Sequence, residues 1–167
     1  MVQFRQLVRG RVDWSRLETV ARELAERYGR EEVHVRFLEA DNWLSTPMVI
    51  DDEWFVKVVS RQNSLVHAFI TTGRNLGAIS SGTEGFFEHF GTPYQMAEHD
   101  LEATRRMREI GVNAPEPVEA LEIDGLGVLV LEYLPDFRSL DDLDREREAE
   151  LAPEVFHTLR RLHDNGL

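Results

Sequence analysis

Apolar residues recur every three or four positions between residues 14 and 28, the spacing that places side chains on one face of a helix. The residues of this stripe are Leu17, Val20, Ala21, Leu24, Ala25 and Tyr28. Ser15 and Glu18 have the spacing of a capping box, and Gly29 follows where a glycine commonly ends a helix. The pattern therefore predicts an early helix whose apolar face needs a partner surface.

Three short segments with strand-like patterns follow, at 33–38, 43–50 and 54–59. The third, WFVKVV, is apolar except for Lys57. Because successive side chains of a strand point to opposite faces, Lys57 shares a face with Phe55. A lysine in such a strand is rarely buried without a partner, which makes Lys57 a candidate functional residue.

The middle of the chain predicts two more helices. One pattern covers 62–78, and the glycine-containing stretch 80–91 is interpreted as an ordered loop. The next helix, expected over 93–110, starts at a capping box formed by Thr92 and Gln95, with proline at its first position. Its expected inner stripe is Asp100, Ala103, Met107 and Ile110. An aspartate therefore lies at the top of an apolar face.

The last third of the chain predicts a hairpin and a final helix. Residues 117–123 and 126–133 are strand-like and flank Asp124-Gly125, a strong turn signal. A helix with a proline interruption is expected over 139–164. Its expected buried residues are Val155, Phe156, Leu159 and Leu162. The order of elements predicts an α+β fold, with a mostly antiparallel five-stranded sheet, a helix packed on it and a short helix before it.

The composition of the chain excludes several classes of function and partner. The formal net charge is −12, from 31 acidic and 19 basic residues, which disfavours direct binding to nucleic acid. The absence of cysteine excludes disulfide frameworks and thiol catalysis. No apolar run approaches the roughly 20 residues of a membrane span, and the first residues lack a signal peptide. We therefore expect a cytoplasmic protein with no membrane partner.

The basic residues are strongly skewed toward arginine, and Lys57 is the single lysine of the chain. Arginine cannot replace lysine where a compact ammonium group is required. A background that disfavours lysine therefore makes the retained Lys57 informative.

Four segments resemble, in this order, parts of the N-terminal lobe of the protein-kinase-like superfamily. They are WFVKVV around Lys57, DLEATRRMREIGVNAPEPVEAL at 100–121, VLVLEYLP at 128–135 and LRRLHDNGL at 159–167. The second is similar to the helix-C region of atypical, RIO-like serine/threonine kinases. The third is similar to the hinge strand, and the fourth to the helix ahead of the catalytic loop. The resemblance covers about residues 33–167 and implies a kinase-like N-lobe.

The resemblance also implies roles for individual residues. In kinases a lysine on the third strand binds the α- and β-phosphates of ATP, and an acid on helix C holds that lysine in place. Lys57 and Asp100 match these positions, with Glu98 and Glu102 as alternative acids if the helix is rotated. Leu131 matches the residue behind the adenine pocket. The residues whose backbone groups would face adenine are Glu132, Tyr133 and Leu134.

The turn at 39–42 corresponds to the phosphate-covering loop, so Asp41 and Asn42 are further candidates for ATP binding. This turn lacks the glycines that let backbone amides approach phosphates. Phe55 stands where kinases commonly have a small residue beside adenine. The resemblance implies that the catalytic loop and the magnesium ligands lie beyond Leu167. The 167 residues alone are therefore expected to be catalytically incomplete.

These expectations divide the chain into three parts. Residues 1–32 form a helical extension, 33–135 the kinase-like lobe with an insertion at 60–91, and 136–167 the start of a helical C-lobe. The parent protein is expected to be an ATP-dependent RIO-like kinase, whose phosphoacceptor, a protein or a small molecule, the sequence does not identify. Two alternatives remain open: a non-catalytic binding or regulatory module, and a small-molecule phosphotransferase.

Overall fold

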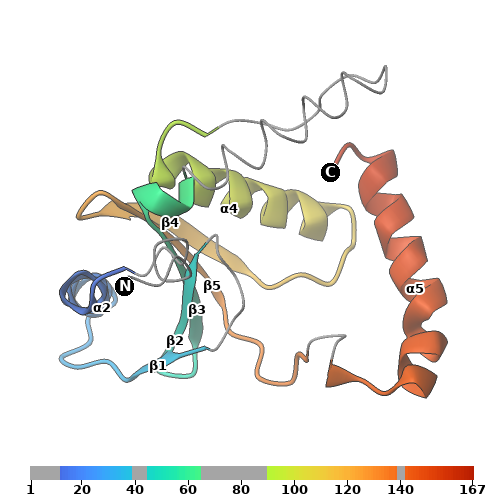
Figure 1. Cartoon of the computed structure of the whole chain (residues 1–167), viewed down its shortest axis with the longest axis horizontal. Helices are drawn as coiled ribbons and strands as arrows, with labels where there is room; N and C mark the ends of the chain where they lie inside the picture. Colours follow the sequence, from blue (N-terminus) through green and yellow to red (C-terminus); the bar gives the residue numbers. More distant parts are fainter. Residues whose placement is uncertain (1–11, 39–44, 65–89, 139–141) are drawn as a thin grey trace, which may run out of the picture.

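A computed structural model describes residues 12–38, 45–64, 90–138 and 142–167 (Figure 1). In chain order the elements are α2 (Trp14–Arg27), β1 (Val35–Phe37), β2 (Thr46–Ile50), β3 (Trp54–Val59), α4 (Pro93–Glu109), β4 (Pro117–Ile123), β5 (Leu126–Glu132) and α5 (Arg145–Asp164). The fold is α+β, with a short N-terminal helix ahead of the sheet, as the hydrophobic pattern predicts. None of the described helices is both long and apolar enough to cross a membrane.

The five strands form one antiparallel sheet in the order β1-β2-β3-β5-β4, so β3 is the central strand. Lys57 on β3 lies opposite Pro47 on β2 and Leu129 on β5. The predicted hairpin is confirmed: β4 and β5 pair across Asp124 and Gly125, both of which have positive φ angles. Central placement gives Lys57 a neighbouring strand on each side.

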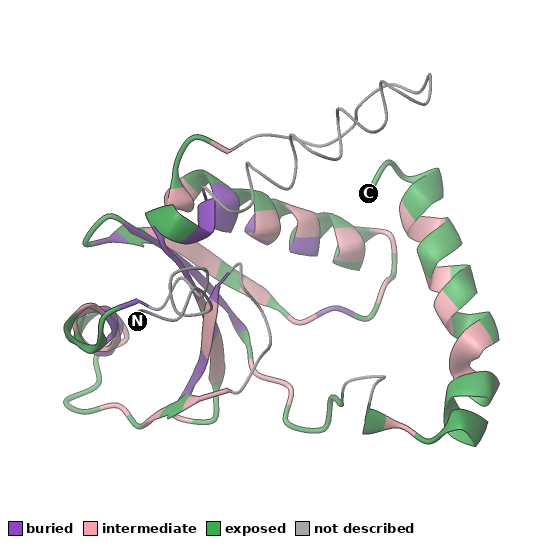
Figure 2. Ribbon diagram, viewed as in Figure 1, coloured by how far each residue is buried: buried purple, intermediate pink, exposed green. Residues whose placement is uncertain are grey.

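Helices cover both faces of the sheet, as Figures 1 and 2 show. The core beneath α2 consists of Val12, Leu17, Val20, Leu24, Met48, Ile50, Val56, Val58, Ile123, Leu126, Val128 and Val130. The core beneath α4 is smaller and consists of Ala97, Leu101, Leu129 and Leu131, with Phe55 and Ala120 packed against it. The larger core anchors the sheet, and the smaller one holds the helix that carries Asp100.

Two helix ends were predicted from glycines, and both predictions are confirmed. Gly29 and Gly111 have φ angles of +66° and +80°, which a residue without a Cβ adopts readily. After α2 the Arg30 N–H donates to the Ala25 carbonyl, and after α4 the Val112 N–H donates to the Met107 carbonyl. These are Schellman hydrogen bonds, which satisfy carbonyls that the helix leaves unpaired.

The first helix begins at Trp14, as its hydrophobic pattern predicts, but the capping box predicted for Ser15 and Glu18 is wrong. Asp13 occupies the N-cap position with extended backbone, and no side chain caps the helix. Ser15 lies inside the first turn, where its carbonyl accepts a hydrogen bond from the Thr19 hydroxyl. The buried side chain of Val12 anchors the chain in the core just before Asp13, which places the N-cap two residues ahead of Ser15.

The helix expected over 62–78 begins at Arg61, and residues 65–89 lie outside the described residues. The final helix begins at Arg145 rather than near residue 139, because the Asp144 carboxylate accepts a hydrogen bond from the Arg147 N–H and caps it.

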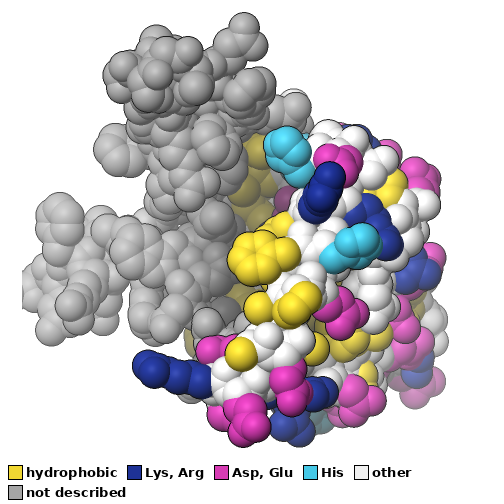
Figure 3. Space-filling model, turned by 90° about the vertical axis from the view of Figure 1, so that its right-hand side faces the viewer, with side chains coloured by type: hydrophobic (Ala, Val, Ile, Leu, Met, Phe, Trp, Pro, Cys, Tyr) yellow, Lys and Arg dark blue, Asp and Glu magenta, His cyan; other side chains and the backbone are white. Residues whose placement is uncertain are grey.

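The expected burial of the final helix is also wrong. No residue of α5 is buried, and Phe156 and Leu159 are 70% and 54% exposed. In Figure 1 α5 stands beside the far end of α4 rather than across the sheet. Figure 3 faces this side of the molecule and shows hydrophobic side chains in the open between charged ones.

Candidate functional site

Strand alternation determines the direction of the Lys57 side chain. Val56 and Val58 on either side of it are fully buried in the core beneath α2. Lys57 and Phe55 therefore point to the opposite face, which α4 covers. The face that the sequence predicts for Lys57 is confirmed.

Asp100 is brought to the same face by the start of α4. The Thr92 hydroxyl accepts from the Gln95 N–H, and the Gln95 side chain accepts from the Thr92 N–H, so the predicted capping box is confirmed. The first turn then lies directly against Gly127 of β5, where an added Cβ would be 2.0 Å from the Pro93 carbonyl oxygen. Only a residue without a side chain permits this approach.

The predicted inner stripe of α4 is rotated relative to the observed one. The buried residues of the helix are Met96, Ala97, Leu101 and Thr104. Asp100 is half-buried, beside this stripe rather than on it. The rotation follows from burial of the small Ala97 and of Leu101 in the core, which leaves the carboxylate at the edge, facing the sheet and still reached by water.

The two charges identified in the sequence form an ion pair. Lys57 Nζ lies 2.5 Å from Asp100 Oδ2, and the two side chains are 27% and 35% exposed. Of the ion pairs between described residues, this is the one in which neither side chain is more than about a third exposed. The Asp100 carbonyl also accepts from the Thr104 hydroxyl at 2.7 Å. The pair is thus held between a central strand and a capped helix.

Neither alternative acid takes part in this pair. Glu102 is exposed, and its Oε2 lies 3.6 Å from Arg105 Nη1. Glu98 lies elsewhere on the helix. It is exposed, and its Oε1 accepts from the Tyr94 hydroxyl at 3.4 Å on another side of α4. One helical residue advances the direction of a side chain by about 100°, so Glu98 and Asp100 cannot both face β3. The structure therefore pairs Lys57 with Asp100.

Phe55 and Leu131 are direct neighbours on the α4 face of the sheet. They are register partners on β3 and β5, and both belong to the small core beneath α4. Leu131 is 8% exposed. The aromatic ring therefore occupies space beside Leu131, two residues from Lys57 on the same face.

The segment that leaves β5 already uses several of its backbone groups. The Glu132 N–H donates to the Glu116 carbonyl at 2.8 Å, and the Tyr133 N–H donates to the Glu53 carbonyl at 2.9 Å. The Leu134 carbonyl accepts from the N–H three residues later, whereas its own N–H makes no hydrogen bond within the described part of the chain. Of the three candidate adenine contacts, Leu134 thus offers an available backbone donor.

Sequence reasoning missed the contact that holds Tyr133. Arg36 on β1 donates to the Tyr133 hydroxyl at 3.2 Å, and its guanidinium lies 5.4 Å from the ring centroid. The arrangement links the edge of the sheet to the segment after β5. No local sequence pattern predicts this contact, because the two residues are far apart in the sequence.

A second missed cluster lies on the opposite face of the sheet. Glu119 of β4 accepts from the Tyr28 hydroxyl at 2.6 Å and from Arg27 Nε at 2.8 Å. Burial raises the pKa of the Tyr28 hydroxyl, and Glu119 raises it further. Burial also raises the pKa of the Glu119 carboxyl, but the hydrogen bonds from Arg27 and Tyr28 outweigh burial, so its pKa is lowered. This cluster fastens α2 to β4.

Two candidate phosphate contacts, Asp41 and Asn42, lie outside the described residues. Within the ranges that the structure describes, no group of three or more histidines, cysteines and carboxylates could hold a metal ion. The chemistry visible here is therefore a paired ammonium and carboxylate beside a largely apolar surface.

No protein-family model matches the chain, and no curated protein matches it.

Proposed function

We propose that this chain is the nucleotide-binding portion of an ATP-dependent, RIO-like serine/threonine protein kinase, and that it acts in the cytoplasm. The observation that carries the proposal is the contact between Lys57 Nζ and Asp100 Oδ2. In kinases a β3 lysine binds the α- and β-phosphates, and a helix-C acid orients it. Here the lysine lies on the third strand and the acid on the α-helix that precedes β4.

The partial exposure of the pair supports this role. Lys57 is 27% exposed beside a carboxylate that fixes its position, so the pair is not sealed in the core. Nucleotide binding at this pair requires such exposure, because a phosphate must reach the ammonium of Lys57 while Asp100 holds it. The available N–H of Leu134 supplies a donor of the kind that adenine ring nitrogens accept.

One observation favours the alternative of a non-catalytic binding or regulatory module. Phe55 packs against the core that contains Leu131, where a nucleotide base would need room. In that case the pair between Lys57 and Asp100 would be a structural link between β3 and α4. The two functions differ in one measurable property, which is whether ATP reaches Lys57.

The single lysine of the chain allows a direct test. A biotin-bearing acyl phosphate of ATP transfers its acyl group to a lysine amine that lies beside the bound phosphates, and ATP is released. We expect this probe to acylate Lys57 in the full chain, with free ATP at about a hundredfold excess suppressing the modification at least fivefold. Peptide mass spectrometry identifies the modified residue, and only the chain's α-amino group competes with it.

Two controls separate nucleotide binding from plain reactivity. An acylating reagent of the same warhead without nucleotide should modify Lys57 to the same extent with and without ATP. Asp100→Asn should weaken ATP protection, because the ammonium loses the partner that orients it. Glu98→Gln, on the same helix but facing away, should leave protection unchanged. Equal labelling by the two reagents, without protection by ATP, would refute nucleotide binding and favour the binding module.

A further inference from the structure

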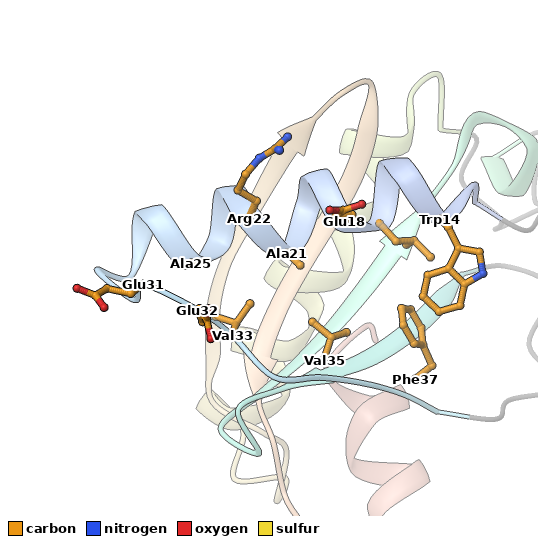
Figure 4. A pocket seen from close by; sticks show the side chains of 11 residues that line it. Trp14, Glu18, Ala21, Arg22, Ala25, Glu31, Glu32, Val33, Val35 and Phe37 are labelled. Atoms are coloured by element: carbon orange, nitrogen blue, oxygen red, sulfur yellow. The ribbon is translucent and has the colours of Figure 1, made fainter.

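A groove lies between α2 and the edge strand β1, on the face of the sheet opposite Lys57 (Figure 4). Its volume is about 520 Å³. The floor is apolar and consists of Leu17, Ala21, Ala25, Val33, Val35 and Phe37. Trp14, 73% exposed, packs edge-on against Phe37 with ring centroids 4.8 Å apart and closes one end. A concave, apolar hollow of this volume is typical of a binding site.

The rim of the groove is acidic. Glu18, Glu31 and Glu32 line it, and all three are exposed. None of them forms an ion pair with another described residue, although nine such pairs exist elsewhere in the described part of the chain. Arg22 is the one cationic side chain in the lining. The groove therefore suits a segment that is both apolar and basic.

The sequence of residues 1–11, MVQFRQLVRGR, has this composition. It contains three arginines and no acidic residue, in a chain whose net charge is −12. Its bulky apolar residues include Phe4, Leu7 and Val8. The segment therefore matches the groove in both properties, with three positive charges for three unpaired glutamates.

Chain connectivity puts the segment within reach. Residue 11 joins Val12, which is buried in the core, and Trp14 at the closed end of the groove follows two residues later. Eleven residues can span up to about 36 Å. The 14 residues of α2, along which the groove runs, measure about 21 Å. The segment can therefore cover the whole groove from its point of attachment.

We propose that residues 1–11 of the same chain occupy this groove, with Phe4, Leu7 and Val8 against its floor and the three arginines against its acidic rim. The groove is on the far face from the ion pair, so this inference does not depend on the proposed function. Docking within one chain is favoured over capture of a second copy, because the tether keeps the segment at a high local concentration.

Disulfide trapping tests the proposal in a full-length chain that has no cysteine of its own. One variant combines Val8→Cys with Ala21→Cys, whose side chain lies in the groove lining. The matched control combines Val8→Cys with Glu23→Cys, on the same helix but outside the lining. In dilute protein under mild oxidation, we expect the groove pair to form an intramolecular disulfide at least tenfold faster, as read from non-reducing gels and peptide masses.

A second variant tests the charge argument. In the groove pair, Glu18→Lys, Glu31→Lys and Glu32→Lys together should slow trapping at least fivefold, while circular dichroism stays that of the parent because these side chains are exposed. Equal trapping rates for the groove and control pairs would overturn the proposal. So would a rate that the rim substitutions do not change. Disulfide-linked dimers whose yield rises with protein concentration would assign the groove to a second copy instead.

Discussion

Gly127→Ala adds a single methyl group at the closest approach between the sheet and α4. The new Cβ would lie 2.0 Å from the Pro93 carbonyl oxygen, 2.4 Å from its carbonyl carbon and 2.9 Å from the Tyr94 nitrogen. All three atoms belong to the backbone of the first turn, so no side-chain rotation relieves the collision. Since real Cβ atoms essentially never come closer than 3.0 Å, the helix start must retreat by at least about 1 Å.

The cost of this retreat can be estimated. Overpacking a well-filled interior destabilises a protein by about 1–3 kcal/mol, and a collision between backbone and Cβ belongs at the upper end. Alanine has less conformational entropy than glycine in the unfolded chain, which offsets roughly 0.5 kcal/mol of this cost. The net loss is about 2.5 kcal/mol, which lowers Tm by about 5–10 °C in a chain of this size.

Thermal unfolding followed by far-ultraviolet circular dichroism measures this loss. Gly91→Ala is the matched control, because its Cβ would meet, among the described residues, a side-chain atom, Gln95 Oε1, at 3.2 Å instead of backbone atoms at 2.0 Å. We expect the control to change Tm by less than about 2 °C. A second measurement uses the single lysine: an amine-reactive acylating reagent should modify Lys57 faster in Gly127→Ala, because the displaced helix carries Asp100 away from it.

The outcome that would contradict this reasoning is specific. If Gly127→Ala melts within about 2 °C of the parent chain, α4 does not lie against β5 as closely as described. If Tm falls but Lys57 reactivity is unchanged, the start of α4 and the position of Asp100 are mechanically independent, and the capped first turn does not position the acid.

Two further predictions concern contacts between elements. The lowered pKa of Glu119 means that its carboxylate stabilises the fold above the unfolded value of about 4.5, and that this contribution is lost as pH falls through the lower folded value. Tm should therefore drop more steeply on acidification from about pH 5 to pH 3 in the parent chain than in Glu119→Gln, and parallel curves would contradict the role of Arg27 and Tyr28. Arg161 Nη1 donates a hydrogen bond to the Gly111 carbonyl at 2.9 Å. Arg161→Gln removes this bond and should weaken the packing of α5 against the end of α4 by about 1 kcal/mol. Hydrogen exchange should accelerate in α5 and not in β3, whereas uniform acceleration would indicate global destabilisation instead.

Local signals in the sequence predicted the parts of the site that depend on local geometry. The period of two on β3 gave the face of Lys57, because that face is fixed by the pleat alone. The capping box at Thr92 and the glycine at position 111 gave the two ends of α4, because backbone groups there require particular partners. The position of Asp100 near the apolar side of α4 could also be predicted, because helical periodicity is a local property of the sequence.

The predictions that were wrong concern features that depend on contacts between distant segments of the chain. The exact rotation of α4 is set by Ala97 and by Gly127, whose importance is apparent only when the helix lies on β5. The exposure of Phe156 and Leu159 could not be read from helical periodicity, which shows that a stripe exists but not whether anything covers it. A glycine in a strand pattern was the available signal for close backbone approach, and Gly127 carried it.

The strand order has a consequence for how the protein folds. β1, β2 and β3 pair with sequence neighbours, as do β4 and β5, so each group can form quickly from local contacts. The pairing of β3 with β5 joins Val59 to Gly127 and must close the long connection that includes α4. Because α4 packs mainly on β4 and β5, we expect Lys57 and Asp100 to meet when this non-local pairing forms. We therefore expect substitutions at this ion pair to accelerate unfolding while leaving the folding rate nearly unchanged, which stopped-flow kinetics would measure.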